Sequence, residues 1–364
     1  MTIESSLRHL WGVQTDYIVV GQGLCGTWLS YYLMRAGASV VVVDPGFVGA
    51  ASAAASGIIN PITGKRLARQ WMGERILPFA KEAYRALGDE LSLTLATELS
   101  IHTFFSTAEE ASFFEAKATA MEDGLLSFGS HMAAADNFNS HYGIGSIHPA
   151  LLVEVRRLLE AWREVLIRQH SIMHEAFDWD DCKLGEDGVR YRDIRAKAVI
   201  DCSGPASASN PNFKRLPFAL NKGEAIIASI PHLPREGIYK YAHLSIVPWE
   251  PDQFWIGSTF DWNFTDALPT AAFRHKAESI LSQWLKLPYT IQEHFAAVRP
   301  ATVTRDAFAG LHPHHPQLGL LNGMGSKGCS LAPFLAHNFA QHLTAGQPMI
   351  AQVELSRYAR VLGG

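Results

Sequence analysis

The N-terminal part of the chain places one helical segment between two short apolar runs. Residues 17–20 and 40–43 are apolar and rich in β-branched side chains, which is the pattern of parallel strands buried on both faces. Residues 27–36 between them have helical character, and Gly37 follows as a residue type that commonly ends a helix. This pattern predicts a strand–helix–strand unit with parallel strands.

The turn between the first strand and the helix carries a glycine motif. Residues 21–26 read Gly-Gln-Gly-Leu-Cys-Gly, which fits GxGxxG: Gly21 permits the tight turn, Gly23 lets the backbone approach a pyrophosphate, and Gly26 lets the helix pack on the strand. The helix N-terminus offers unpaired N–H groups to phosphates. Asp44, at the end of the second strand, is placed to accept hydrogen bonds from a ribose diol. Because strand, motif, helix and acid follow in this order, we expect dinucleotide binding rather than an ordinary turn.

The remainder of the chain mixes helical and strand patterns. Residues 74–126 have an amphipathic order of Glu, Ala, Leu and Lys that predicts helix. Residues 225–228, 244–248 and 254–257 form β-rich runs separated by prolines that mark turns. These runs predict an antiparallel sheet with one face toward a ligand.

Composition and charge narrow the picture mainly by exclusion. The chain has 364 residues, for which two domains are expected, and 31 basic against 35 acidic side chains give a net charge of −4. This balance offers no footprint for nucleic acid or a membrane surface. The four cysteines are scattered, the first 14 residues lack the apolar segment of a signal peptide, and no apolar run approaches a membrane span. We therefore expect a soluble, cytoplasmic protein with no nucleic-acid or membrane partner.

A run of small residues follows the strand–helix–strand unit. Residues 49–61 read Gly-Ala-Ala-Ser-Ala-Ala-Ala-Ser-Gly-Ile-Ile-Asn-Pro; such residues suit a backbone packed against a flat ligand, although an Ala-rich helix start or a flexible loop fits the composition equally well. Together with GxGxxG and the acid, this run resembles the D-amino acid oxidase superfamily of FAD enzymes, which includes glycine oxidase, sarcosine oxidase and the FAD domain of a bifunctional tRNA-modifying enzyme. The resemblance implies that Ser52 and Ala53 pass the pyrophosphate and that Ser56, Gly57 and Ile58 lie beside the isoalloxazine ring.

Later segments extend the resemblance over about residues 16–343. Residues 172–177 and 196–205 resemble the family's strands near the adenine and adenosine, and residues 298–302 and 322–333 resemble its two closing motifs. The resemblance implies FAD held by Gly21, Gly23, Leu24, Cys25, Gly26, Asp44, Ser52, Ala53, Ser56, Gly57, Ile58, Ala176, Phe177, Ser203, Gly204, Gly323, Gly325, Ser326, Lys327 and Gly328.

The same resemblance implies an α/β fold with two discontinuous domains. A Rossmann-type FAD-binding domain would comprise residues 1–85, 145–215 and 298–364. An inserted α+β substrate domain, containing a mostly antiparallel sheet, would comprise residues 86–144 and 216–297. The flavin would lie between the two domains, where pockets commonly form.

Two cations are candidates for holding a substrate carboxylate. Arg299 precedes Pro300 as in the carboxylate-binding motif of glycine oxidase-like members, and a planar guanidinium grips a carboxylate through two hydrogen bonds; the alternative is a surface ion pair. Lys327 matches a carboxylate-binding lysine of sarcosine oxidase-like members, or places its charge near the flavin pyrimidine edge, or is a solvated loop residue. Arg299 also occupies the position where some relatives tether flavin through a cysteine, so we expect non-covalent FAD.

One departure from the family leaves the substrate open. Members often carry a tyrosine just before the Val-Pro step, where this chain has Ser245, with Tyr239, Tyr241 and His243 nearby. No metal site is expected, because the histidines of residues 312–315 lack helical spacing and carboxylate partners, and a solvent-facing loop is predicted there.

These observations lead to one main hypothesis and three alternatives. The main hypothesis is an FAD-dependent oxidoreductase that oxidises the C–N bond of a small amine or amino acid by hydride transfer to flavin, with the electron acceptor unknown. The alternatives are an FAD-dependent 2-hydroxy acid dehydrogenase, an oxidase that modifies an aminomethyl uridine of tRNA, and a flavin-binding protein with a degenerate site.

Overall fold

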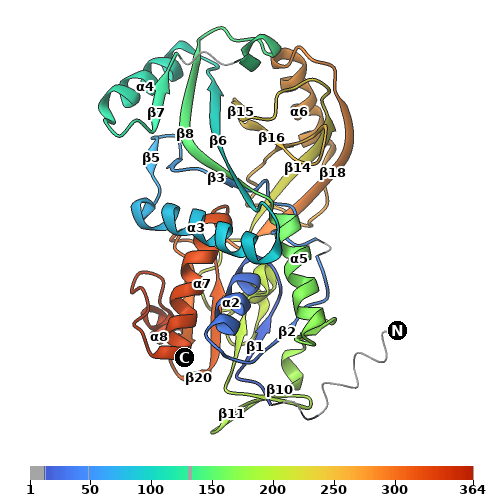
Figure 1. Cartoon of the computed structure of the whole chain (residues 1–364), viewed down its shortest axis with the longest axis vertical. Helices are drawn as coiled ribbons and strands as arrows, with labels where there is room; N and C mark the ends of the chain where they lie inside the picture. The colour runs from blue at the N-terminus through green and yellow to red at the C-terminus, as the bar shows by residue number, and fades with distance from the viewer. Residues whose placement is uncertain (1–11, 13, 48, 130–132, 364) are drawn as a thin grey trace.

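Two β-sheets, one toward each end of the long axis, form the body of the molecule (Figure 1). The computed structural model describes residue 12 and residues 14–47, 49–129 and 133–363. Residues 1–11, to which most of the signal-peptide expectation refers, lie outside the described residues. The helix α3 (Gly73–Leu91) crosses between the two sheets in the view of Figure 1.

The lower sheet has six strands in the order β19–β20–β13–β1–β2–β9. All neighbours are parallel except β19 and β20. The strand β1 lies between β2, which follows it in the chain, and β13, which comes much later, so the loop after β1 stands at a topological switch point, where α/β sheets bind ligands. The strands are β1 (Tyr17–Val20), β2 (Val40–Val43), β9 (Ile172–Met173), β13 (Ala198–Asp201), β19 (Phe308–His312) and β20 (His315–Asn322).

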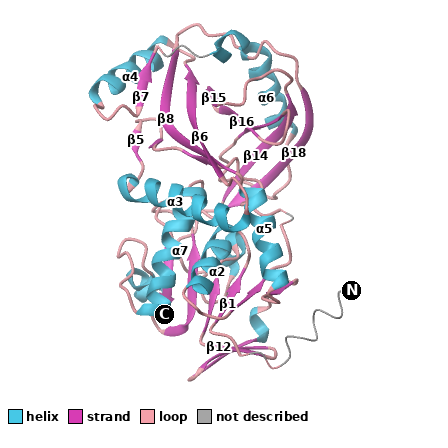
Figure 2. Cartoon of the chain, viewed as in Figure 1, coloured by secondary structure: helices cyan, strands magenta, loops and turns pink. Residues whose placement is uncertain are grey.

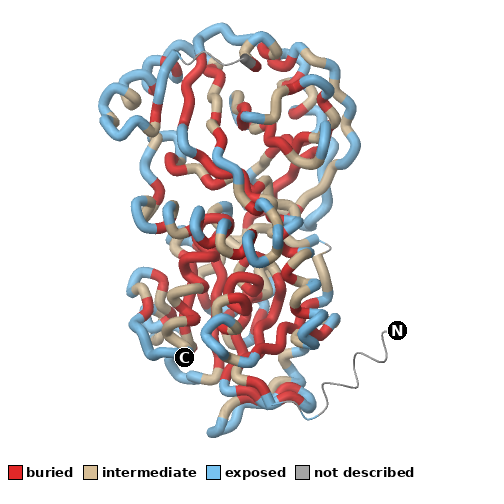
Figure 3. The backbone as a smooth tube through the Cα atoms, in the orientation of Figure 1, coloured by how far each residue is buried: buried red, intermediate tan, exposed pale blue. Residues whose placement is uncertain are grey.

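Helices cover one face of this sheet and a small antiparallel sheet covers the other. The apolar side chains on the two faces form separate buried clusters, and Figure 3 shows this layer as one of two buried regions. The helices are α2 (Leu24–Arg35), α5 (Val155–Arg168) and α7 (Gly328–Ala345). The small sheet consists of β10 (Cys182–Gly185), β11 (Gly188–Tyr191) and β12 (Ile194–Ala196), and α8 (Ala359–Leu362) lies near the C-terminus.

The upper sheet has nine strands, and all its neighbours are antiparallel except β15 and β6 (Figure 2). One face packs on α6 (Ala271–Trp284) and the other contributes to a second apolar cluster that includes α4 (Ala108–Ala120). The strands are β18 (Thr290–Arg299), β14 (Asn221–Ser229), β17 (Gln253–Gly257), β16 (Leu244–Pro248), β15 (Gly237–Tyr241), β6 (Ala96–Phe104), β8 (Ile144–Val153), β7 (Leu126–Phe128) and β3 (Ile58–Ile59). A short hairpin, β4 (Ile62–Thr63) and β5 (Ala68–Arg69), completes the strands.

The predicted fold class is confirmed, with local corrections. The expected helix over residues 74–126 is wrong in its centre, where β6 pairs with β8 and β15. The solvent-facing loop expected at residues 312–315 is wrong for His312, which is buried at the end of β19. Both β3 and β8 pair within the upper sheet, although they fall in segments assigned to the FAD-binding domain; the division into domains itself stays a prediction. In the described parts of the chain, every helix is too short or too polar to span a bilayer.

Replacing Gly26 by alanine tests the packing of α2 on β1. A Cβ atom there would overlap the carbonyl oxygen of Gly21, so the turn must shift. We expect Gly26→Ala to lower the free energy of unfolding by about 1–3 kcal/mol, as overpacking does, in urea denaturation. Gly73→Ala is the control, because a Cβ there lies 3.7 Å from its nearest neighbours. Equal effects of the two substitutions would contradict the proposed tight contact.

Candidate active site

One cavity of about 1590 Å³ runs between the two sheets. Its lower part is lined by the carboxyl ends of β1, β2 and β13, and its upper part by the inner face of the nine-stranded sheet. Sites for one small ligand usually measure roughly 300–1,000 Å³. The cavity therefore has room for a large cofactor and a second, smaller molecule.

The turn after β1 forms the lower wall of the cavity. Gly21 has φ +90°, and a Cβ atom there would lie 2.8 Å from the carbonyl oxygen of Cys202, so only glycine fits. Gly23 caps α2 without a side-chain hydrogen bond, while Ser52 Oγ accepts from Leu24 N at 3.0 Å. The N-terminus of α2 thus faces the cavity with Ser52 beside it, an arrangement suited to phosphate oxygens.

The carboxylate of Asp44 is almost saturated by protein donors. It accepts from Gln22 N (2.7 Å), Gly46 N (2.8 Å) and Arg163 Nη1 (2.6 Å). An ionised carboxylate has about four acceptor sites, so one remains for a ligand hydroxyl. Asp44 is buried and lines the cavity, so this remaining site lies where a ribose would approach.

Buried hydrogen bonds fix the turn after β13. Asp201 accepts from Ser203 N at 2.9 Å and from Ser207 Oγ at 2.8 Å, and Asn322 Nδ2 donates to Gly204 O at 2.8 Å. This network holds Ser203 and Gly204 at the cavity wall, opposite Asp44 across β1.

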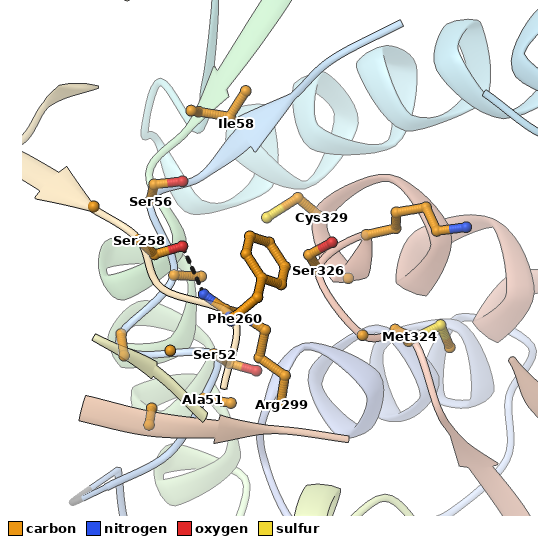
Figure 4. Close-up of a pocket in the computed structure, with 18 of the residues that line it drawn as sticks. Ala51, Ser52, Ser56, Ile58, Ser258, Phe260, Arg299, Met324, Ser326 and Cys329 are labelled. Carbon is orange, nitrogen blue, oxygen red and sulfur yellow. Dashed lines mark hydrogen bonds between the residues drawn. The ribbon is translucent and has the colours of Figure 1, made fainter. Parts of the chain in front are cut away.

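Small residues and a second helix N-terminus line the middle of the cavity. The segment before β3 is tied to the upper sheet, because Trp255 Nε1 donates to Ala54 O at 3.1 Å. On the other side, Gly325 N donates to Pro300 O at 3.0 Å, which joins the two C-terminal motifs. The helix α7 begins at Gly328 without a side-chain cap, and Figure 4 shows Ser56 and Ile58 facing Ser326 and Cys329 across the cavity.

Most of the predicted cofactor residues line the cavity, and four do not. Those that line it are Gly21, Gly23, Leu24, Cys25, Asp44, Ser52, Ser56, Ile58, Ala176, Phe177, Ser203, Gly204, Gly325, Ser326, Lys327 and Gly328. The others serve close packing: Gly26 lies against Gly21, Gly57 against Val153, Gly323 against Thr302, and Ala53 against the apolar cluster of the lower half.

Arg299 lies on the inner face of the upper sheet with neutral partners. Its Nη1 donates to Asn221 Oδ1 (2.9 Å) and Thr259 O (3.0 Å), and its Nη2 donates to Ser258 Oγ (2.8 Å). Phe260 covers the guanidinium at 4.6 Å from the ring centroid, as Figure 4 shows. Burial lowers the pKa of Arg299 to about 10, and no carboxylate lies within ion-pair distance of it among the described residues. The surface ion pair considered above is therefore absent from the described structure.

Lys327 occupies the N-cap position of α7, without a side-chain cap hydrogen bond, at the edge of the same cavity. It is partly buried, and burial lowers the pKa of its ammonium group, with Asp306 acting in the opposite direction. Ser245 and His243 also line the cavity, whereas Tyr239 packs against Phe138 on the opposite face of the sheet. Tyr241 stacks on Trp284 in the same cluster. Neither tyrosine therefore stands in for the tyrosine that family members often carry at the position of Ser245.

Sequence reasoning missed several contacts of the site. Arg163, on α5, donates to Asp44 over 119 sequence positions, and Phe260 reaches Arg299 from a loop with no recognisable motif. Lys240 also lines the cavity. Its place two residues after Ile238 in the same strand, and so on the same face of the sheet, could have indicated this. In the described ranges, no three His, Cys, Asp or Glu side chains are grouped as a metal site requires.

Comparison with known proteins decides the family. The family model DAO, described as "FAD dependent oxidoreductase", matches residues 16–342. The chain belongs to this family. The oxidoreductase is 25% identical to a glycine oxidase of Pseudomonas putida over 92% of this chain and 95% of the relative.

Solved structures share the fold of the oxidoreductase. Glycine oxidase from Geobacillus kaustophilus superposes with a TM-score of 0.75 at 18% identity, over 95% of this chain and 98% of that one. Iminodiacetate oxidase from Chelativorans sp. BNC1 superposes with a TM-score of 0.74 at 18% identity, over 94% and 98% of the two chains. Membership of this family makes the protein an FAD-dependent enzyme. Its cavity, the two helix N-termini without a side-chain cap and the single remaining Asp44 acceptor fit that cofactor.

Gly223→Ala tests whether the position of the Arg299 guanidinium requires the absence of a side chain at residue 223. A Cβ atom on Gly223 would overlap Nη1, Nη2 and Cζ of Arg299, so the guanidinium must move. We expect the variant to retain FAD but to bind a small carboxylate, such as benzoate, about 10- to 100-fold more weakly, as misplacement of one group does. Flavin absorbance during titration measures this.

Gly185→Ala is the matched control, because a Cβ atom there meets only Gly188 O at 3.7 Å and lies in the small sheet. Benzoate binding by Gly223→Ala at the level of Gly185→Ala would show that Arg299 takes no part in binding the anion.

Proposed function

We propose that this enzyme oxidises the C–N bond of a small amine that carries a carboxylate, an amino acid or N-alkyl amino acid, with non-covalently bound FAD. The observation that carries the proposal is the charge of Arg299, which is held at the cavity by neutral oxygens alone. Two proteins similar to this chain, a glycine oxidase and an iminodiacetate oxidase, are named for the oxidation of such amines.

The guanidinium has donors to spare for a substrate carboxylate. Arginine has five N–H groups, and three are used by Asn221, Thr259 and Ser258. The N–H on Nε and one on Nη2 have no partner among the described residues. With Phe260 over one face and burial around it, the charge lies in a poorly solvated place, where attraction to a carboxylate is stronger than in water.

We assign different residues along the cavity to different parts of FAD. We assign Gly21, Gly23 and Ser52 to the pyrophosphate, Asp44 to the ribose and Ser56 and Ile58 to the ring side. The chemistry that FAD supplies when bound is acceptance of the hydride from the carbon beside nitrogen, which leaves an imine once the nitrogen loses a proton. Arg299 orients the substrate, and the α7 N-terminus with Lys327 favours negative charge at its end of the cavity.

The cysteines of the cavity support a non-covalent cofactor. Cys25, Cys202 and Cys329 line the cavity. Burial raises the pKa of all three thiols, to about 12 for Cys25 and Cys329. Thiols form covalent bonds as thiolates, so all three stay protonated and unreactive near neutral pH. FAD should therefore leave the protein on mild denaturation and remain in the supernatant after acid precipitation.

Substitution of Arg299 tests the proposal. We expect Arg299→Met to lower kcat/KM for a carboxylate-bearing amine by about 10²- to 10³-fold, as loss of one partner of a desolvated ion pair does, with FAD content unchanged. Arg299→Lys should retain part of the activity, because it keeps the positive charge but loses the paired N–H donors of the guanidinium. Arg274→Met, which removes an exposed arginine on α6, is the control.

A substrate panel identifies the reaction through anaerobic bleaching of the flavin. We expect amino acids or N-alkyl amino acids to bleach it, and amines without a carboxylate to do so poorly. Bleaching by 2-hydroxy acids alone would make the protein a hydroxy acid dehydrogenase, since Arg299 would bind their carboxylate equally well. Salt-dependent binding of tRNA with bleaching by an aminomethyl uridine would instead favour the tRNA-modifying alternative.

A further inference from the structure

A second cation lies on the inner face of the upper sheet, away from Arg299. Lys240 is in β15, and its register partners are Thr103 on one side and Ser245 on the other. Ser245 pairs with Gly257, and Gly257 pairs with Ala225. All five residues line the cavity, so one continuous row across the sheet faces the same space.

The ammonium group of Lys240 has no protein partner there. Within the described residues, neither a hydrogen bond nor an ion pair engages its side chain. Burial alone lowers its pKa, which is the expected effect on an ammonium group held without a neighbouring carboxylate. Buried lysines are normally paired, so this unpaired charge needs a ligand to compensate it.

Glu110 is a carboxylate that lines the cavity. It accepts from Ser106 N (3.0 Å) and Ser106 Oγ (2.7 Å), which lowers its pKa. Glu110 is exposed at the start of α4, so it lies at the margin of the cavity. Among the described residues no ion pair joins it to Lys240, and burial is the only cause of the lowered pKa of Lys240.

The separation of the two cations follows from the register of the sheet. The guanidinium of Arg299 lies directly over Gly223, two residues before Ala225 on β14. Lys240 is three strands away from Ala225, along β17, β16 and β15. With roughly 4.8 Å between strands and 3.3 Å per residue, the Cα atoms of Lys240 and Gly223 lie about 16 Å apart in a flat sheet, and curling of the sheet shortens this.

The wall between the two cations is mostly apolar. Ala225, Trp255 and Ile238 line it from the sheet, and Ser245 is a polar member of the row that joins Lys240 to Ala225. A molecule that bridges the two charges therefore needs an anionic group at each end and a short apolar middle.

We propose that Lys240 is a specificity-determining residue that binds a second carboxylate of the substrate, so that the enzyme acts on amino or imino dicarboxylates. This inference rests on the proposed function, in which Arg299 binds the first carboxylate. An attraction between Lys240 and the far carboxylate offsets the cost of burying both charges.

Binding of unreactive ligands to the FAD-loaded protein tests the inference without turnover. We titrate linear dicarboxylic acids from malonate to adipate against monocarboxylic acids of the same carbon number, and follow flavin absorbance. We expect at least one dicarboxylic acid to bind about 10- to 100-fold more tightly than its monocarboxylic counterpart. Lys240→Met should remove this preference, because it removes one charge-assisted hydrogen bond. The affinity for monocarboxylic acids should stay within about threefold of that of the parent protein.

Two further variants distinguish the effect of the Lys240 charge from an effect on the structure of the protein. Lys240→Arg should keep part of the preference, because it keeps the charge. Lys286→Met removes an exposed lysine after α6, outside the cavity, and should behave as the parent protein. Unchanged dicarboxylate binding in Lys240→Met, or an equal loss for both classes of acid, would overturn the inference.

Turnover kinetics provide a second test. The two pairs of substrates to compare are glutamate with glutamine, and iminodiacetate with N-methylglycine. We expect the parent enzyme to favour the dicarboxylate of a pair through KM, and Lys240→Met to lose that preference with kcat little changed. If no amine bleaches the flavin, the proposed function fails while the titrations still decide the role of Lys240. If amines are oxidised and the titrations show no preference for two carboxylates, the inference fails alone.

Discussion

The close contact between the end of β1 and the start of α2 is the constraint on which the site depends. A side chain at Gly26 would overlap the carbonyl oxygen of Gly21, and a side chain at Gly21 would meet Cys202 O at 2.8 Å. Three backbone segments thus meet where no Cβ atom fits. This contact aims the N-terminus of α2 at the cavity and brings the turn after β13 beside it, so the lower wall is set by backbone rather than by side chains.

A different principle operates on the upper wall. There the nine-stranded sheet presents one face to the cavity, and glycine at position 223 leaves the space that the guanidinium of Arg299 fills. The chain supplies neutral oxygens around that guanidinium and places no carboxylate near it in the described structure. The lower half therefore offers dipoles and turns to a ligand, whereas the upper half offers charges that no carboxylate pairs among the described residues.

The sequence predicted what local patterns encode. The bounds of β1 and β2 agree with prediction, because each is a continuous apolar run bounded by turn residues. The strand β6 was missed because its alternation is broken by a bulge between Leu99 and Ile101, and its polar residues suit a helix equally well. The partners of Asp44 and Arg299 could not be predicted, since Arg163 and Phe260 are brought to them only by the packing of distant elements.

The short strand β3 has a consequence for how the two halves depend on each other. Ile58 and Ile59 pair with Leu152 and Leu151 of β8, so the small-residue segment beside the cofactor is also an edge strand of the upper sheet. A ligand that orders this segment stabilises the hydrogen-bonded edge at the same time. If the segment binds the flavin as we propose, cofactor loading and the rigidity of the proposed substrate wall are linked thermodynamically, because the same segment belongs to both.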